Sequence, residues 1–178
     1  MKLLYSTEEV SARVDEMARQ IVQTYTGNKP VFVCLLRGGV PFASQLAAAI
    51  ARRAPDFHPE LEYLHVSAYG SDRTAGVAQT YSGIDASRIA GRDVVVLDDC
   101  LDQGVTYTHA KQYLLEHGAS SVGLVVLADK DVSRDGVEPP LIAGFKTPNV
   151  WLVGMGMDDA GTAPEAERWA GYIGDVSA

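Results

Sequence analysis

The chain has 178 residues, of which 47% are hydrophobic and 21% charged, and its formal net charge is -8. At roughly 150 residues per domain, this length predicts one domain over residues 1–178. A mean hydropathy of -0.01, with no apolar run near the ~20 residues of a membrane span, excludes membrane and disordered classes. The acidic balance argues against a nucleic-acid partner, which needs a basic face. It leaves room for an anionic small molecule, because a cationic pocket or bound metal ions can reverse the local field.

Two features of the sequence bear on where the protein works. Its two cysteines, Cys34 and Cys100, lie in or beside apolar runs, which is typical of buried thiols in a reducing compartment. The first residues, MKLLYSTEE, lack the long apolar segment of a secretion signal. We therefore expect a cytoplasmic protein.

Strand-like and helix-like segments alternate along the chain. Ser6 followed by Glu8 and Glu9 predicts a helix start, and apolar residues then recur at helical spacing until Gly27. The remaining predicted elements, in chain order, are a strand at Val31–Leu36, a helix at Phe42–Ile50, a strand at Tyr63–Tyr69, a loop or hairpin over 70–91, a strand at Val94–Leu97, a helix from Gly104 to about His117, and strands at Val122–Leu127 and Val150–Val153.

This alternation predicts an α/β fold with a central, mostly parallel sheet flanked by helices. In such folds ligands bind beyond the carboxyl ends of the strands. Most of the polar and glycine-containing motifs of this chain fall at those ends.

The strongest motif is VVVLDDCLDQGVTYT, residues 94–108. A buried strand leads to Asp98 and Asp99, and Asp102 and Gly104 then precede a helix that begins near Thr106. Backbone N–H groups at such a helix start bind anions. The two carboxylates would repel a phosphate unless they held ribose hydroxyls or hydrated Mg²⁺. The motif therefore indicates a phosphorylated sugar bound with a metal ion.

Two other interpretations of this motif are open. It could be an ordinary helix start after a strand, although three acids there are costly without a purpose. It could also be the DDxxD metal motif of prenyl-transferring enzymes, but that motif lies on long helices of all-α proteins. The Gly154-Met155-Gly156 run lacks the third glycine of a dinucleotide fingerprint.

The motif resembles the phosphoribosyl-pyrophosphate signature of type I phosphoribosyltransferases, and an acid at position 102 is similar to the hypoxanthine-guanine (6-oxopurine) subgroup. Four more segments resemble parts of that family in the family's order. They are the pyrophosphate loop at Leu35–Gly39, the start of the mobile loop at Ser67–Gly70, the strand end bearing the purine-contacting lysine at Ala128–Lys130, and the base-stacking and metal segment at Val150–Asp158.

The resemblance implies the type I phosphoribosyltransferase fold, with a small hood built from the termini and a non-proline cis peptide at Leu36–Arg37. It implies a glycosyltransferase of purine salvage that moves 5-phosphoribose from phosphoribosyl pyrophosphate to hypoxanthine or guanine, giving IMP or GMP and pyrophosphate. Mg²⁺ is the implied cofactor, and a homodimer or homotetramer is the implied assembly.

The resemblance also assigns roles to individual residues. Asp102 would take or stabilise the N7 proton of the base, Lys130 and Trp151 would hold the purine, and the backbone of Leu152 would contact its exocyclic edge. The loop that begins at Ala68 and Tyr69 would close over the site. Phosphoribosyl pyrophosphate would be bound by Leu36, Arg37, Gly38, Asp98, Asp99, Gln103, Gly104, Val105, Thr106 and Arg168, and Mg²⁺ by Asp98, Asp99 and Asp158.

The chain departs from the family pattern at several positions. Gln103 stands where the family usually has Thr, Ala68 replaces a customary Ser, and an apparent insertion precedes Arg168. A regulatory protein with the same fold, or a transferase for another base, are the alternative functions. By residue type alone, Lys130 could be a solvated lysine and Trp151 a core residue.

Overall fold

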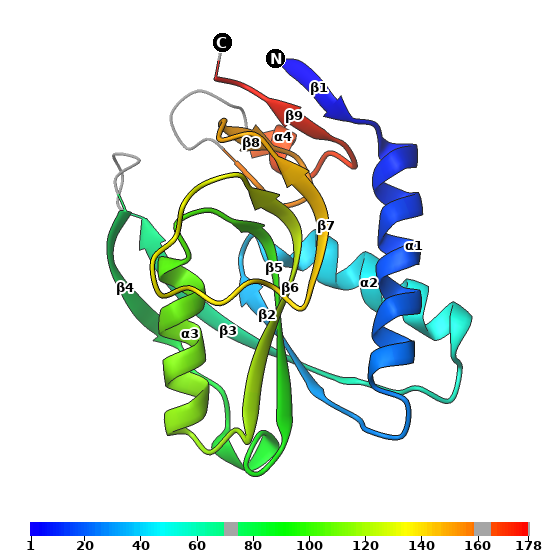
Figure 1. Cartoon of the computed structure of the whole chain (residues 1–178), viewed down its shortest axis with the longest axis vertical. Coiled ribbons are helices and arrows are strands. Elements are labelled where there is room, and N and C mark those ends of the chain that lie inside the picture. The colour runs from blue at the N-terminus through cyan, green and yellow to red at the C-terminus, as the bar shows by residue number, and fades with distance from the viewer. Residues whose placement is uncertain (70–74, 159–164, 178) are drawn as a thin grey trace.

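The computed structural model describes residues 1–69, 75–158 and 165–177, and a six-stranded sheet runs through its centre (Figure 1). The strand order is β4-β3-β2-β5-β6-β7. The four pairings from β3 to β7 are parallel, and the β3–β4 pair is antiparallel. The strands are β2 (Val31–Leu36), β3 (Glu60–Tyr69), β4 (Ala75–Ser82), β5 (Asp93–Leu101), β6 (Ser121–Lys130) and β7 (Ile142–Thr147).

Helices cover both faces of this sheet. Helices α1 (Thr7–Thr24) and α2 (Gly39–Arg53) pack against one face, and α3 (Val105–Glu116) packs against the other. The central strands are apolar along nearly their whole length because both of their faces are buried. Alternate residues of β2 therefore enter opposite cores, with Phe32 under α1 and α2 and Val33 under α3.

A second, three-stranded antiparallel sheet is built from the two ends of the chain. Its order is β1 (Lys2–Tyr5), β9 (Ile173–Asp175) and β8 (Leu152–Val153). In Figure 1 this sheet lies at one end of the central sheet, beside the short helix α4 (Glu165–Arg168). A 3₁₀ turn at Ala86–Arg88 precedes β5. The small sheet is the hood that the resemblance implies.

The predicted start of the first helix is confirmed in detail. The Ser6 side chain accepts a hydrogen bond from the backbone N–H of Glu9, and the Glu9 carboxylate accepts one from the backbone N–H of Ser6. This reciprocal pair satisfies two of the N–H groups that a helix start leaves open. For the region 70–91 the sequence predicts a loop or a hairpin. The structure has the hairpin, because β4 lies in this region and pairs antiparallel with β3.

One predicted strand is placed wrongly. Val150–Val153 was expected to continue the parallel sheet, but that position belongs to β7, and Leu152–Val153 pairs with β9 in the hood. The apolar run at 150–153 reflects the burial of Leu152 and Val153 within the hood. Strand β7 lies at the sheet edge and includes Gly144 and the exposed Lys146, so its apolar pattern is weak.

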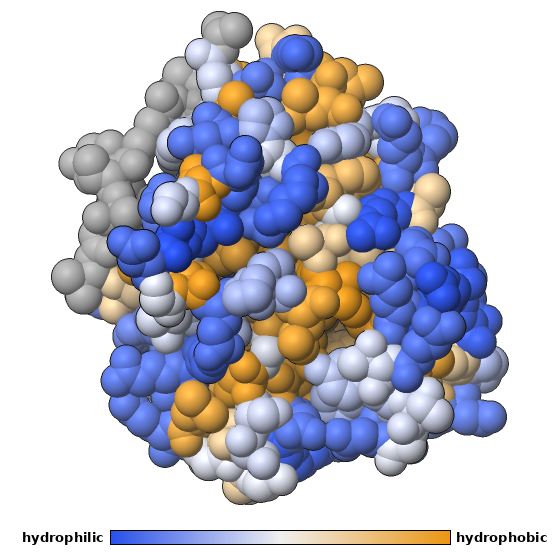
Figure 2. Space-filling view, in the orientation of Figure 1, coloured by the Kyte–Doolittle hydropathy of each residue, from blue (hydrophilic) through white to orange (hydrophobic). Residues whose placement is uncertain are grey.

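Hydrophilic residues cover most of the face seen in Figure 2, and hydrophobic residues show mainly in patches between them. Within the described part of the chain, no helix has the length and apolar character needed to cross a membrane.

Candidate active site

The carboxyl ends of β2 and β5 meet a loop of the hood. The Leu36–Arg37 peptide bond at the end of β2 is cis, as the resemblance implies, and Arg37 is exposed. A side chain at Gly38 would overlap the carboxylate of Asp99, and one at Gly156 would overlap the carbonyl oxygen of Gly38. Glycine at both positions lets three chain segments approach one another at this point.

Asp98 and Asp99 form a carboxyl pair at the end of β5. The backbone N–H of Asp99 donates to Oδ1 of Asp98 over 3.1 Å, and the two carboxyl groups also hydrogen-bond each other. Both side chains are partly exposed, yet desolvation by the surrounding protein raises both pKa values. Repulsion from Asp99 raises the pKa of Asp98 further, whereas the positive charge of Arg168 partly offsets the rise for Asp99.

The negative field of this pair reaches both cysteines. Burial raises the pKa of Cys34 to about 12, and the charges of Asp98 and Asp99 add to that rise. Burial also raises the pKa of Cys100 well above its usual value, and Asp99 contributes again. The end of β5 is therefore a region of negative charge that Arg168 offsets only in part, and it favours a bound cation.

A second charged group lies at the end of β6, beside the first. Lys130, whose side chain is 7% exposed, donates from Nζ to Oδ2 of Asp102 over 2.7 Å. The same ammonium lies 5.5 Å from the centroid of the Trp151 ring, within the range of a cation–π contact. An acceptor, a donor and a flat aromatic surface therefore gather at one place.

The start of α3 differs from the start of α1. Gly104 precedes the helix in a left-handed conformation, with φ of 80°, and no side chain caps the first turn. No acidic residue lies in that turn, so its backbone N–H groups and the positive end of the helix dipole remain available to an anion. The Gln103 side chain is exposed and reaches back to Oδ1 of Asp102 at 3.4 Å.

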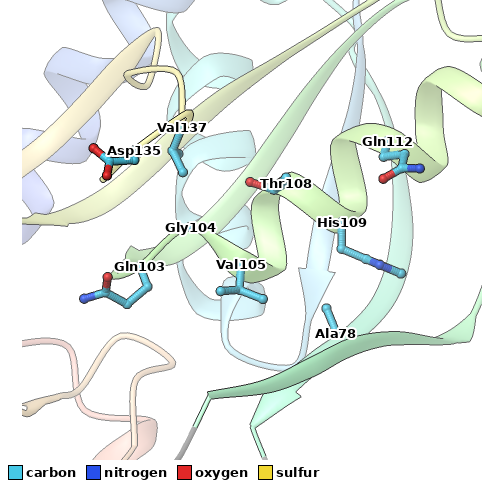
Figure 3. Close-up of a pocket in the computed structure, with 9 residues that line it drawn as sticks. All are labelled: Ala78, Gln103, Gly104, Val105, Thr108, His109, Gln112, Asp135 and Val137. Carbon is cyan, nitrogen blue, oxygen red and sulfur yellow. The ribbon is translucent and has the colours of Figure 1, made fainter. Parts of the chain in front are cut away.

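A cavity of about 420 Å³ borders this helix start (Figure 3). In Figure 3 the Thr108 side chain points toward Val137, on the loop after β6, and His109 projects toward the other side. His109 Nε2 lies 2.9 Å from Oγ1 of Thr80 on β4, so the hairpin is tied to α3. The cavity is lined by Ala78, Gln103, Gly104, Val105, Thr108, His109, Gln112, Asp135 and Val137.

The hood brings its own charged pair to the site. Arg168 forms an ion pair with Asp158 and donates to the carbonyl oxygen of Gly156 over 3.1 Å. Through Gly156 this pair adjoins Gly38 and therefore Asp99. Leu152, on β8, is buried.

The site offers carboxylates to the Mg²⁺ that the resemblance implies. Within the described residues, no three His, Cys, Asp or Glu side chains gather around one point that could hold a metal. Asp158 is engaged by Arg168, so its role as a metal ligand stays a prediction. Mg²⁺ commonly takes only one or two carboxylates and completes its shell with water and substrate oxygens. The unbalanced pair Asp98 and Asp99 fits that requirement.

Some of the predicted residues lie outside the part of the chain that the structure describes, and one residue of the site, Arg134, is not predicted from the sequence. The side chains of Ala68 and Tyr69, and residues 70–74 of the loop, lie outside the described part of the chain. Arg134 donates hydrogen bonds to the backbone carbonyl groups of Asp102 and Lys130, but the sequence does not single it out. Its spacing of four residues after Lys130, in a polar loop, gives no signal that separates it from a solvated arginine.

Comparisons with known proteins agree on one family. The model of the phosphoribosyl transferase domain matches residues 2–160. A hypoxanthine-guanine phosphoribosyltransferase of Lactococcus lactis is 34% identical over 158 residues, which is 88% of this chain and 82% of that protein. One from Streptococcus mutans is 32% identical over 97% of this chain and 91% of its own length. The crystal structure of a hypoxanthine phosphoribosyltransferase from Staphylococcus aureus superposes with a TM-score of 0.84 at 27% identity, covering 98% of this chain and 90% of that one.

Proposed function

This chain belongs to the phosphoribosyl transferase family, and from that premise we propose that it transfers 5-phosphoribose from phosphoribosyl pyrophosphate to N9 of hypoxanthine or guanine. The products are the purine nucleotide, IMP or GMP, and pyrophosphate. The observation that carries the proposal is that Asp102, Lys130 and Trp151 gather at the end of β6, next to the end of β5 that carries Asp98 and Asp99.

The Asp102–Lys130 pair suits one edge of a 6-oxopurine. In the N7–H tautomer that edge presents a donor at N7 next to an acceptor at O6. The carboxylate of Asp102 accepts from N7–H, and the ammonium of Lys130 donates to O6, while the purine ring stacks on Trp151. As N9 bonds to the ribose, N7 becomes more acidic, and Asp102 takes or stabilises its proton. Assistance of this kind contributes roughly 10²–10⁴ in rate.

The sugar phosphate fits the other half of the site. The 5-phosphate would lie on the N–H groups at the uncapped start of α3, from Gln103 to Thr106. Asp98 and Asp99 would hold the ribose hydroxyls and, with them, Mg²⁺. When bound, Mg²⁺ would neutralise the charge of the departing pyrophosphate. Arg37 and Arg168 would add positive charge on the pyrophosphate side of the ribose, and the backbone of Leu36 to Gly38 would bind the same pyrophosphate.

We also propose that the enzyme works in the cytoplasm as a homodimer or homotetramer. Size-exclusion chromatography with light scattering tests the assembly, and a monomer at working concentration would contradict it.

The function is tested by measuring pyrophosphate release with phosphoribosyl pyrophosphate, Mg²⁺ and five bases in parallel. We expect turnover with hypoxanthine and guanine. Turnover with adenine or uracil alone would indicate a transferase for another base. If no base supports release while the protein shifts RNA in a gel, a regulatory function replaces the enzymatic one.

A further inference from the structure

The loop that follows β6 carries Arg134, an arginine whose side chain is largely buried. Arg134 has a side chain that is only 11% exposed, although it lies in a polar connection between two strands. Its Nη2 donates to the carbonyl oxygens of Leu101 and Lys130, each over 2.6 Å, and its Nε donates to that of Asp102. Its Nη1 forms an ion pair with Asp129 at 2.9 Å. All three guanidinium nitrogens are therefore engaged.

These contacts join the ends of two neighbouring strands. Leu101 and Asp102 belong to the end of β5 and the turn after it, and Asp129 and Lys130 end β6. The backbone ladder between these strands finishes at the pairing of Leu101 with Asp129. Arg134 continues the connection for one more residue on each strand. It bonds the backbone of both members of the Asp102–Lys130 pair while touching neither of their functional groups.

The position of Arg134 is in turn fixed by the buried carboxylate of Asp129. Asp129 is 1% exposed and also pairs with Lys146 of β7 at 2.5 Å. Its carboxylate is thus shared between two cations, one of which is Arg134. A planar guanidinium directs its donors in fixed directions, so a fork held at Asp129 fixes where the carbonyl groups of Leu101, Asp102 and Lys130 can lie.

We infer that Arg134 is a positioning residue for the purine half of the site. It sets the spacing between the Asp102 carboxylate and the Lys130 ammonium to the spacing of N7 and O6 on the base. This inference rests on the proposed function. Arg134 makes no hydrogen bond or ion pair with the Asp98–Asp99 pair or the first turn of α3 among the described residues, so its main effect should be on the base.

The test is a steady-state comparison of Arg134→Lys and Arg134→Met with the wild type, in which the KM for hypoxanthine and the KM for phosphoribosyl pyrophosphate are measured separately. A misplacement of about 1 Å at a reacting group costs on the order of 100-fold. We expect Arg134→Met to lose roughly 10- to 100-fold in kcat/KM for hypoxanthine, with the KM for phosphoribosyl pyrophosphate nearly unchanged. Arg134→Lys keeps the ion pair with Asp129 but loses the fork, so its loss should be intermediate.

Arg92→Met is the matched control. Arg92 also pairs with a carboxylate, Glu60, and donates to two backbone carbonyl groups, those of Arg88 and Lys29, but it lies at the opposite end of the sheet. We expect it to lower thermal stability without changing either KM. Binding of IMP, followed by calorimetry, gives a second readout that is independent of turnover and should weaken only in the Arg134 variants.

Different failures have different meanings. A wild type without transferase activity on 6-oxopurines overturns the proposed function and this inference with it. An active wild type whose Arg134→Lys variant keeps the wild-type KM for hypoxanthine and affinity for IMP overturns the inference alone. The same holds if both KM values rise in parallel, since that is the result of a merely structural arginine. If Arg134→Met fails to fold, Arg134→Lys decides the question.

Discussion

The ends of β5 and β6 lie side by side in the sheet, yet their charged groups have opposite surroundings. At the end of β5, Asp98 and Asp99 repel each other, and desolvation raises both pKa values. At the end of β6, Asp129 is shared by Arg134 and Lys146, and Lys130 pairs with Asp102. This difference matches the two proposed substrates. The end of β5 requires the positive charge of a bound metal ion to hold the sugar pyrophosphate, whereas the ion pair of Asp102 and Lys130 at the end of β6 suits a neutral base.

The largest expected effect concerns the carboxylate that faces Lys130. Asp102→Asn should lower kcat by roughly 10²–10⁴-fold, because an amide cannot take a proton from N7. Steady-state pyrophosphate release measures this, with circular dichroism to establish that the fold is kept. Asp93→Asn, at the other end of β5 where Asp93 bonds Asn28 and Ser121, is the control. Near-normal turnover by Asp102→Asn would remove Asp102 from the reaction.

The balanced end of β6 should be sensitive to loss of its buried anion. Asp129→Asn leaves Arg134 and Lys146 without their shared carboxylate, and breaking a buried ion pair from one side costs about 3 kcal/mol or more. Urea denaturation should show this as a lower free energy of unfolding. Glu60→Gln, which breaks surface pairs with Arg88 and Arg92, should cost less than about 1 kcal/mol. Equal losses in the two variants would contradict the distinction.

The stacking surface should affect only the base. Trp151→Leu removes the aromatic plane beside Lys130, and such stacking contributes about 1–3 kcal/mol. The KM for hypoxanthine should therefore rise about 10-fold or more, with little change in the KM for phosphoribosyl pyrophosphate. Trp169→Leu, at a position that is 57% exposed, is the control. A rise in the KM for the sugar phosphate alone would place Trp151 outside the purine site.

The unbalanced end of β5 should gain stability when its repulsion is removed. Asp98→Asn should stabilise the free protein by about 0.5–2 kcal/mol while impairing activity. The folded pKa of Asp98 lies above its unfolded value, so the native state holds a proton that the unfolded state releases. Wild-type stability therefore falls as the pH rises through that window, and the advantage of Asp98→Asn should be larger at pH 8 than at pH 4. A pH-independent difference would show that Asp98 is not the titrating group.

The parts of the fold that follow from strong local signals were predicted well from the sequence. The apolar runs of β2 and β5 and the capping box at Ser6 depend on neighbouring residues, and the structure shows them where expected. Strand β1 and edge strand β7 were not foreseen, since partly exposed strands carry little apolar periodicity. The assignment of 150–153 to the central sheet was wrong because burial within the hood produces the same apolar pattern.

The candidate site likewise has one part that the sequence predicts and one part that it does not. Asp98, Asp99, Asp102 and Lys130 come at or just after the apolar runs of β5 and β6, so their meeting at one edge could be predicted. The contacts of Arg134 and the pairing of Arg168 with Asp158 depend on how loops fold back over that edge. No local pattern encodes such contacts.

The contrast between the two strand ends is tested most directly by calorimetry of wild-type protein with phosphoribosyl pyrophosphate and with IMP, each with and without Mg²⁺. Binding of the sugar pyrophosphate should require Mg²⁺, because Asp98 and Asp99 otherwise oppose it, whereas IMP should bind nearly as well without the ion. Equal affinity for phosphoribosyl pyrophosphate in the presence and absence of Mg²⁺ would contradict the account.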